Sequence, residues 1–286
     1  MKVLTHKQRI LLKVIEELYK KGTSSKFMLV KNLFLLYKET NIERLVKFYH
    51  FYPYKYGPFS NECYTDLGKL ERAGFVVEEG KYLMLTEKGM HATSTANLKA
   101  SYKVKRTVNM FKSDREIRKY VYSHYPEYTV KSEIVPTPEK RHAPGIFTIG
   151  YEGKDIDSFL NILIKNEIDV IVDVRKNPFS MKFNFTQNKL KNYLKKVDIQ
   201  YIHIPELGIE GKLRDDLSTI DDYQNLFEQY KATTLKERPD QIERIVKLGE
   251  KHRASLMCFE GSKDFCHRGS IAENIKTKHE VEVTHL

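Results

Sequence analysis

Cysteine is scarce in this sequence. The three cysteines are Cys63, Cys258 and Cys266, and no two of them form a C-x-x-C pair. A small, odd number of widely spaced cysteines is not a disulfide framework and is typical of a protein kept in a reducing compartment. We therefore expect no disulfide.

Long apolar runs and a secretory leader are also missing. No stretch reaches the roughly 18 apolar residues that a membrane-spanning helix needs, and the start, Met1 to Arg9, lacks an apolar core with a small-residue cleavage site. The chain has 286 residues, of which 41% are hydrophobic and 30% charged. We expect a soluble, cytoplasmic protein with two domains and no membrane partner.

The net charge of +11 is distributed unevenly along the chain. Residues 1–141 contain 27 Lys plus Arg against 15 Asp plus Glu, whereas residues 142–286 contain 22 against 23. A basic half next to a neutral half predicts that the N-terminal half meets a polyanion or an acidic surface, and that the C-terminal half does separate work.

The domain boundary is predicted from prolines. Residues 136–145 contain three prolines and a glycine, which exclude both a helix and a central strand. We therefore expect a nucleic-acid-binding domain over residues 1–97, a basic helical connector with a proline-rich linker over residues 98–145, and a pocket domain over residues 146–286.

The N-terminal pattern consists of helices and one hairpin. Apolar residues recur at helical spacing over residues 4–18 and 26–38, and Ser60 can cap a helix that ends at Gly74. Pro53, Gly57 and Pro58 predict a loop before that helix. Two short strand patterns over residues 75–77 and 82–85 are joined by a turn that contains Gly80.

Three helices, a glycine-containing hairpin and a closing helix resemble a winged helix-turn-helix domain. The segment Tyr54-Lys-Tyr-Gly-Pro-Phe-Ser60 resembles phage-associated antitoxin-like domains. The first resemblance implies that residues 60–73 are a recognition helix and that the hairpin is the wing. The side chains that would then contact nucleic acid, with double-stranded DNA as the expected partner, are Asn61, Thr65, Lys69, Arg72 and Lys81. Protein interaction or homodimerisation is the alternative role for such a domain.

In the C-terminal half, short apolar strands alternate with helices. Strands are predicted over residues 146–149, 170–174, 201–204, 255–259 and 281–284, and helices near residues 155–166, 186–197, 221–250 and 269–277. This alternation predicts an α/β fold with a parallel sheet between two helical layers, preceded by the mainly helical N-terminal domain.

Ligands of such sheets bind beyond the carboxyl ends of the strands. Polar side chains lie at these ends in an unusual number, so we expect them to converge on one cleft. The candidate catalytic residues are Asp173, His203, Glu260 and Cys266. The candidate ligand-binding residues are Tyr151, Arg175, Asn177, Ser180, Glu206, His267 and Arg268.

Four ordered motifs in this half resemble an uncharacterised family of domains of unknown function, DUF488. They are Thr148-Ile-Gly-Tyr-Glu-Gly153, Asp173-Val-Arg-Lys-Asn-Pro-Phe-Ser180, Tyr201-Ile-His-Ile-Pro-Glu-Leu-Gly208, and Cys258-Phe-Glu260 with Cys266-His-Arg268. Met181 departs from the pattern, because a basic residue commonly follows the serine in that family, and Ile209-Glu210-Gly211 departs where a glycine pair is common. The family has no settled activity, so the resemblance implies a pocket and no particular reaction.

The residue types limit the chemistry. The Cys266–Arg268 segment precedes a helix and favours a small anionic ligand such as a nucleotide. Cys266 can also act as a nucleophile with His203 or His267 as base, although Ala272 stands where a phosphatase loop needs arginine. Cys258, Glu260, Cys266 and His267 are potential metal ligands. We assign none of them, because the adjacent Cys266-His267 pair is an awkward chelate and the paired spacings usual for zinc are missing. Since dinucleotide and P-loop motifs are missing, no cofactor is expected.

The function expected from these residues is nucleic-acid binding, with an α/β pocket that binds a nucleotide-like substrate. Paired carboxylates such as Asp173 and Glu260 could hydrolyse a glycosidic or phosphoester bond in it without a metal. Two alternatives without catalysis stay open: a regulator that senses an anionic ligand and changes its DNA affinity, and an antitoxin-like interaction protein.

Overall fold

A computed structural model describes residues 4–94, 97–135, 142–214, 217 and 219–286. The chain forms two compact units, unit 1 over residues 1–138 and unit 2 over residues 139–286. Residues 136–141 of the predicted linker lie outside the described residues. Among the described residues, no helix has both the length and the apolar character needed to span a membrane.

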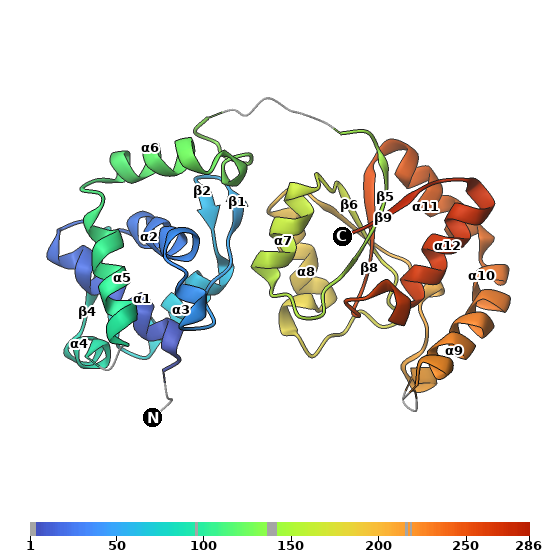
Figure 1. The fold of residues 1–286 in the computed structure, drawn as a ribbon, viewed down its shortest axis with the longest axis horizontal. Coiled ribbons are helices and arrows are strands. Elements are labelled where there is room, and N and C mark those ends of the chain that lie inside the picture. The colour runs from blue at the N-terminus through green and yellow to red at the C-terminus, as the bar shows by residue number, and fades with distance from the viewer. Residues whose placement is uncertain (1–3, 95–96, 136–141, 215–216, 218) are drawn as a thin grey trace. The chain divides into compact units, whose positions relative to one another are not determined.

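Unit 1 is mainly helical (Figure 1). Its helices are α1 (His6–Lys20), α2 (Lys26–Glu39), α3 (Asn61–Arg72), α4 (Glu87–Thr93), α5 (Leu98–Asn109) and α6 (Asp114–His124). Three-residue helical turns form over η1 (Ile42–Arg44) and η2 (Pro126–Tyr128). Helix α5 packs on α1 and α2, and α6 packs on α2. The segment that the sequence analysis treated as a connector therefore contributes Val104 and Ile117 to the core of unit 1.

Unit 1 also contains two antiparallel hairpins. One pairs β3 (Val76–Glu79) with β4 (Tyr82–Leu85), with Gly80 in the turn at a φ of 60°. The other pairs β1 (Tyr52–Tyr54) with β2 (Gly57–Phe59), where the prolines predicted only a loop. Proline is tolerated in such a two-stranded edge pair because each strand needs hydrogen-bond donors on one side only.

The helices of unit 1 begin where side chains can satisfy free backbone N–H groups. At α1, the Thr5 hydroxyl accepts from the backbone N–H of Gln8, whose side chain accepts in return from that of Thr5. At α3, the Ser60 hydroxyl accepts from the backbone N–H of Cys63. The predicted cap of α3 therefore fixes where this helix begins.

Unit 2 is an α/β domain, as the sequence predicted, with five parallel strands. The strands are β5 (Gly145–Gly150), β6 (Val170–Asp173), β7 (Gln200–His203), β8 (Arg253–Cys258) and β9 (Val283–His285). Their order in the sheet is β7-β6-β8-β5-β9. Because β5, β6 and β8 are neighbours in the middle of the sheet, the residues that follow them meet at its carboxyl edge.

Helices cover both faces of this sheet (Figure 1). Helices α7 (Ile156–Lys165) and α8 (Gln187–Lys195) lie on one side, and α9 (Ile220–Ala232), α10 (Thr234–Glu237), α11 (Pro239–Lys251) and α12 (His267–His279) lie on the other. Short helical turns connect them over η3 (Phe183–Phe185), η4 (Pro205–Leu207), η5 (Gly211–Arg214) and η6 (Lys263–Phe265). The helix predicted over residues 221–250 is three helices. One break lies at Thr233, between α9 and α10, and the other lies before Pro239, which lacks the N–H that a continuous helix needs and instead starts α11.

Candidate functional site

A cavity of about 750 Å³ lies at the carboxyl edge of the sheet in unit 2. Five of the residues predicted for the ligand site line it, namely Tyr151, Arg175, Asn177, Ser180 and His267. The other described residues that line it are Lys176, Phe179, Met181, Lys182, Ile209, Glu210, Gly211, Lys212, Cys258 and Phe259. The cavity thus joins segments that follow β5, β6 and β8 with the first residue of α12.

A buried ion pair forms part of this edge. The Asp173 carboxylate accepts from the backbone N–H, Nε and Nη2 of Arg175 at 2.6–3.1 Å, and from the hydroxyl of Tyr201 at 2.6 Å. Four donors fill the usual capacity of a carboxylate. Burial opposes the positive charge of Arg175, but its hydrogen bonds to Asp173 and the negative charge of that carboxylate outweigh burial and raise the arginine pKa. Asp173 therefore positions Arg175.

Arg175 continues this network to the cavity. Its Nη1 donates to the Tyr151 hydroxyl at 2.8 Å, and that hydroxyl donates to the Ser180 Oγ at 3.2 Å. The same Oγ also accepts from the backbone N–H of Lys182. Burial raises the pKa of Tyr151 despite the nearby arginine, so its hydroxyl remains a proton donor. Because the Ser180 Oγ already accepts two hydrogen bonds, its hydroxyl proton can be donated to a ligand.

Basic residues gather beside the cavity. The ammonium of Lys182 donates to the carbonyl oxygens of Tyr151 at 3.2 Å and Lys154 at 3.1 Å. Burial lowers the pKa of Lys154, and the positive charges of Arg268 and Lys182 lower it further. The contribution of these two charges, which is smaller than that of burial, is one that a bound anion would offset.

Arg268 is itself buried and connects the first turn of α12 to the loop that follows β8. Its Nη1 donates to the carbonyl oxygen of Glu260, and its Nη2 donates to that of Gly261 at 2.7 Å. A side chain at Gly150 would place its Cβ 1.8 Å from the Glu260 carbonyl oxygen and 3.1 Å from Arg268 Nη2. Glycine is therefore required in the first of the four motifs because the backbone after β8 passes directly over it.

Six predicted residues lie outside the described lining of the cavity: Asp173, His203, Glu206, Glu260, Cys266 and Arg268. His203 Nε2 lies 2.8 Å from the carbonyl oxygen of Arg175, and the exposed Glu206 lies in η4, outside the described lining of the cavity. His203 thus holds the backbone that carries Arg175. The predicted set does share one edge of the sheet, but only part of it lines one cavity.

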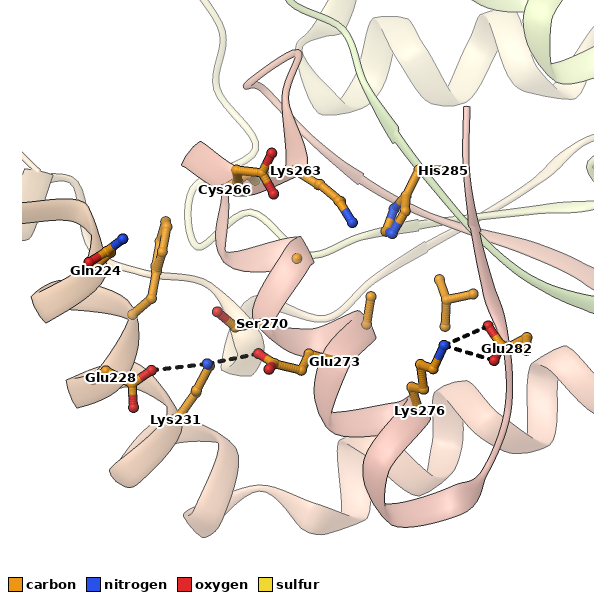
Figure 2. A pocket seen from close by; sticks show the side chains of 15 residues that line it. Gln224, Glu228, Lys231, Lys263, Cys266, Ser270, Glu273, Lys276, Glu282 and His285 are labelled. Carbon is orange, nitrogen blue, oxygen red and sulfur yellow. Dashed lines mark hydrogen bonds and ion pairs between the residues drawn. The ribbon is translucent and has the colours of Figure 1, made fainter. Parts of the chain in front are cut away.

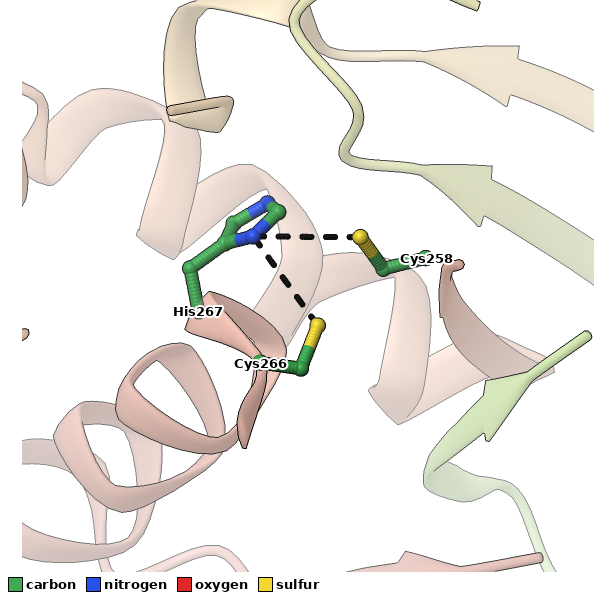
Figure 3. A group of neighbouring side chains, drawn as sticks. All are labelled: Cys258, Cys266 and His267. Atoms are coloured by element: carbon green, nitrogen blue, oxygen red, sulfur yellow. Dashed lines mark hydrogen bonds between the residues drawn. The ribbon is translucent and has the colours of Figure 1, made fainter. Parts of the chain in front are cut away.

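Two residues that line the cavity, Cys258 and His267, belong to a cluster with Cys266, whose side chains Figure 3 shows. The sulfur atoms of Cys258 and Cys266 lie 3.8 and 3.9 Å from the Nδ1 of His267. All three side chains are buried, and Cys258 also lies 3.2 Å from the Oε2 of Glu260. Burial raises the pKa of Cys266 well above its usual value, and Cys258 raises it further. In this environment Cys266 is a protonated thiol, and a protonated thiol is a weak nucleophile.

A second depression of about 760 Å³ lies between α9 and α12 (Figure 2). Its charges are largely paired: Lys231 bridges Glu228 at 3.0 Å and Glu273 at 2.7 Å, and Lys276 pairs with Glu282. Because these lysines already have carboxylate partners, this groove offers less to an anion than the first cavity does.

In unit 1, the residues predicted to contact nucleic acid differ in exposure. Thr65, Lys69 and Arg72 are exposed along one face of α3, and Lys81 is exposed beside the hairpin turn. Asn61 is buried, and its side-chain amide donates to the Tyr52 hydroxyl at 3.0 Å. In this conformation Asn61 supports the β1–β2 hairpin and cannot reach a nucleic acid.

Sequence reasoning missed several residues that line the cavity: Lys176, Lys182, Lys212, Phe179 and Phe259. The sequence offered one indication of Lys182. This lysine directly follows Met181, which stands where the family pattern commonly has a basic residue. Met181 is 95% exposed, whereas the Lys182 ammonium reaches back to the end of β5. The basic group is thus present, displaced by one residue.

Comparison with known proteins supports the relationship of unit 2. Residues 155–275 match the family "Domain of unknown function DUF488". The matched range contains three of the four motifs, and Thr148–Gly153 lies before it. The match does not extend to unit 1, whose winged-helix resemblance remains a prediction. No curated protein and no solved structure matches the chain.

Proposed function

We propose that this chain is a nucleic-acid-binding protein whose DUF488 region binds a nucleotide, free or within a nucleic acid strand, in the cavity at the sheet edge. The observation that carries the proposal is the pairing of cations with exposed aromatic rings around that cavity. Lys176, Lys182 and Lys212 line it, and of its described lining residues one is acidic, Glu210. A ligand with a negative charge is therefore favoured.

The aromatic residues support a ligand with a flat ring. Phe179 is 67% exposed and Phe259 is 40% exposed, although both are large apolar side chains. Such exposure at the rim of a cavity is unfavourable unless a partner covers the rings. Nucleobases stack on aromatic side chains, and their phosphates pair with lysine, so one ligand class explains both features.

The geometry supports binding more directly than hydrolysis. Both oxygens of Asp173 are engaged by Arg175 and Tyr201, so this carboxylate is not positioned to activate water. The proposal therefore assigns Ser180 and Lys182 to ligand binding, and gives Asp173 the task of holding Arg175.

Calorimetric titration of the full chain with nucleoside monophosphates tests the cavity. Phe259→Ala should weaken binding about 5- to 150-fold, because stacking contributes about 1–3 kcal/mol per base. Lys182→Ala should weaken binding about tenfold or more through loss of a charged contact. Lys231→Ala, which removes a paired lysine of the second groove, should leave the affinity unchanged. Equal effects of all three substitutions, or no binding by the unsubstituted chain, would refute the proposal.

For unit 1 we infer contact with double-stranded DNA through the exposed face of α3. Thr65, Lys69 and Arg72 are spaced so that they lie on one side of the helix, and the N-terminal half carries the excess of positive charge. Phosphate contacts by lysine and arginine release counterions, so DNA affinity should fall steeply with added salt.

A salt titration of DNA binding measures this. Arg72→Ala should reduce the slope of log affinity against log salt by about one, whereas Lys20→Ala, at the end of α1 and paired with Glu16, should not change it. A flat salt dependence in the unsubstituted chain would remove DNA from the proposal and leave the nucleotide cavity untouched.

A further inference from the structure

Three buried donor atoms converge at the junction of β8 and α12 (Figure 3). Cys258 is the last residue of β8, Cys266 precedes α12, and His267 is its first residue. The two sulfur atoms and an imidazole nitrogen all lie within 4.8 Å of one another. Folding therefore brings together two thiols and one histidine from segments that are eight residues apart in the sequence.

The distances fit a tetrahedral metal ion. Zinc lies about 2.3 Å from a cysteine sulfur and about 2.0 Å from a histidine nitrogen, which places these two ligands about 3.5 Å apart. The two sulfur–nitrogen distances are 3.8 and 3.9 Å. These two distances are a few tenths of an ångström longer than the tetrahedral value, and the two sulfur atoms lie within 4.8 Å of each other, against about 3.8 Å in such a site.

The histidine is oriented as a ligand. Its Nε2 lies 2.9 Å from the carbonyl oxygen of Val174. A carbonyl can only accept, so Nε2 carries the proton and the neutral ring presents the lone pair of Nδ1 to the sulfur atoms. A backbone carbonyl that fixes the tautomer and the ring orientation in this way is the usual support of a metal-binding histidine.

We propose that Cys258, Cys266 and His267 bind one zinc ion whose fourth position faces the cavity. Cys258 and His267 both line that cavity, so a fourth ligand, water or a group of the bound molecule, can approach from it. Three protein ligands and one open position are characteristic of zinc that acts on a ligand. Two sulfur atoms and one nitrogen select zinc over the harder calcium and magnesium. The proposal is independent of the nucleotide proposal.

The alternative is a hydrogen-bonded cluster without metal. In it the Cys258 thiol donates to the Glu260 carboxylate, 3.2 Å away, and the Cys266 thiol donates to His267. The two arrangements differ in protons. When one zinc ion replaces the hydrogens of both thiols, two protons are released per ion, whereas the hydrogen-bonded cluster releases none.

The first experiment measures zinc in the purified, tag-free full chain by mass spectrometry of elements. The unsubstituted chain and Cys63→Ser should each contain one zinc ion per chain, because Cys63 lies in the core of unit 1. Cys266→Ser and His267→Gln should each contain at least tenfold less. Absence of zinc from the unsubstituted chain after growth with added zinc, or its full retention in both variants, would overturn the proposal.

The second experiment uses only the unsubstituted chain, so its outcome does not depend on whether a variant of the cluster folds. The unsubstituted chain is stripped with a chelator and titrated with Co²⁺ and with Zn²⁺ in weakly buffered solution. Expected results are intense thiolate-to-cobalt absorption, its loss when zinc is added, and release of two protons per zinc ion. A weak octahedral cobalt spectrum without proton release would identify the hydrogen-bonded cluster and overturn the proposal.

Discussion

Replacing the buried Lys31 with methionine should remove a pH dependence from the stability of unit 1. Lys31 lies on α2 and is 3% exposed, and its ammonium donates to the carbonyl oxygen of Pro58 at 2.9 Å. Burial, assisted by the positive charge of Arg118, lowers its pKa from 10.5 to about 7. The charged form is therefore much less favourable in the folded chain than in the unfolded chain.

The sign and size of the effect follow from the two pKa values. Between about pH 7 and pH 10.5 the unfolded chain holds a proton on Lys31 that the folded chain has released. Unfolding then takes up a proton, so stability rises with pH by up to about 1.4 kcal/mol per unit. Over the range from pH 7 to pH 9 the lysine should contribute a gain of roughly 2 kcal/mol.

The assay is urea unfolding at pH 7 and pH 9. Unfolding is monitored by pulsed hydrogen exchange in peptides from α2, and these peptides report on unit 1 alone. Lys31→Met keeps the length of the side chain and removes its charge. The difference in unfolding free energy between the unsubstituted chain and this variant should change by roughly 2 kcal/mol between the two pH values. For Lys38→Met, an exposed lysine on the same helix, it should stay constant. A constant difference for Lys31→Met as well would refute the reasoning.

Three further predictions concern stability. Asp173→Ala leaves a buried arginine without its carboxylate and should lower the unfolding free energy of unit 2 by about 3–5 kcal/mol in urea titrations; a loss below about 1 kcal/mol would contradict the buried ion pair. Ser60→Ala removes the cap of α3 and should cost unit 1 about 1 kcal/mol, measured in the same way. Gly208→Ala would place a Cβ 2.1 Å from the backbone nitrogen of Lys176 and should lower the melting temperature of unit 2, whereas Gly211→Ala, with open space around it, should not.

The layout of unit 2 could be predicted because its signals are local. The five short apolar runs lie within a few residues of the five strands, and parallel strands bring their carboxyl ends to one edge whatever the details of packing. The prediction of one continuous helix over residues 221–250 was wrong, because the apolar periodicity does not reveal the breaks at Thr233 and before Pro239.

The site could be predicted only in part, because the sequence does not tell which polar groups bond to each other. An aspartate and an arginine two residues apart can belong to a catalytic site or form a buried ion pair, and the sequence fits both. Only the structure shows that four donors occupy the Asp173 carboxylate. The cysteine–histidine cluster was set aside for its spacing, yet strand and helix bring Cys258 and His267 together regardless of that spacing.

The start of α12 lies beside two recesses of unit 2. His267 lines the cavity at the sheet edge, and its neighbour Cys266 lines the groove between α9 and α12. The start of α12 thus borders two recesses, one lined by several lysines and the other crossed by ion pairs. A molecule bound in either recess would therefore contact the start of α12.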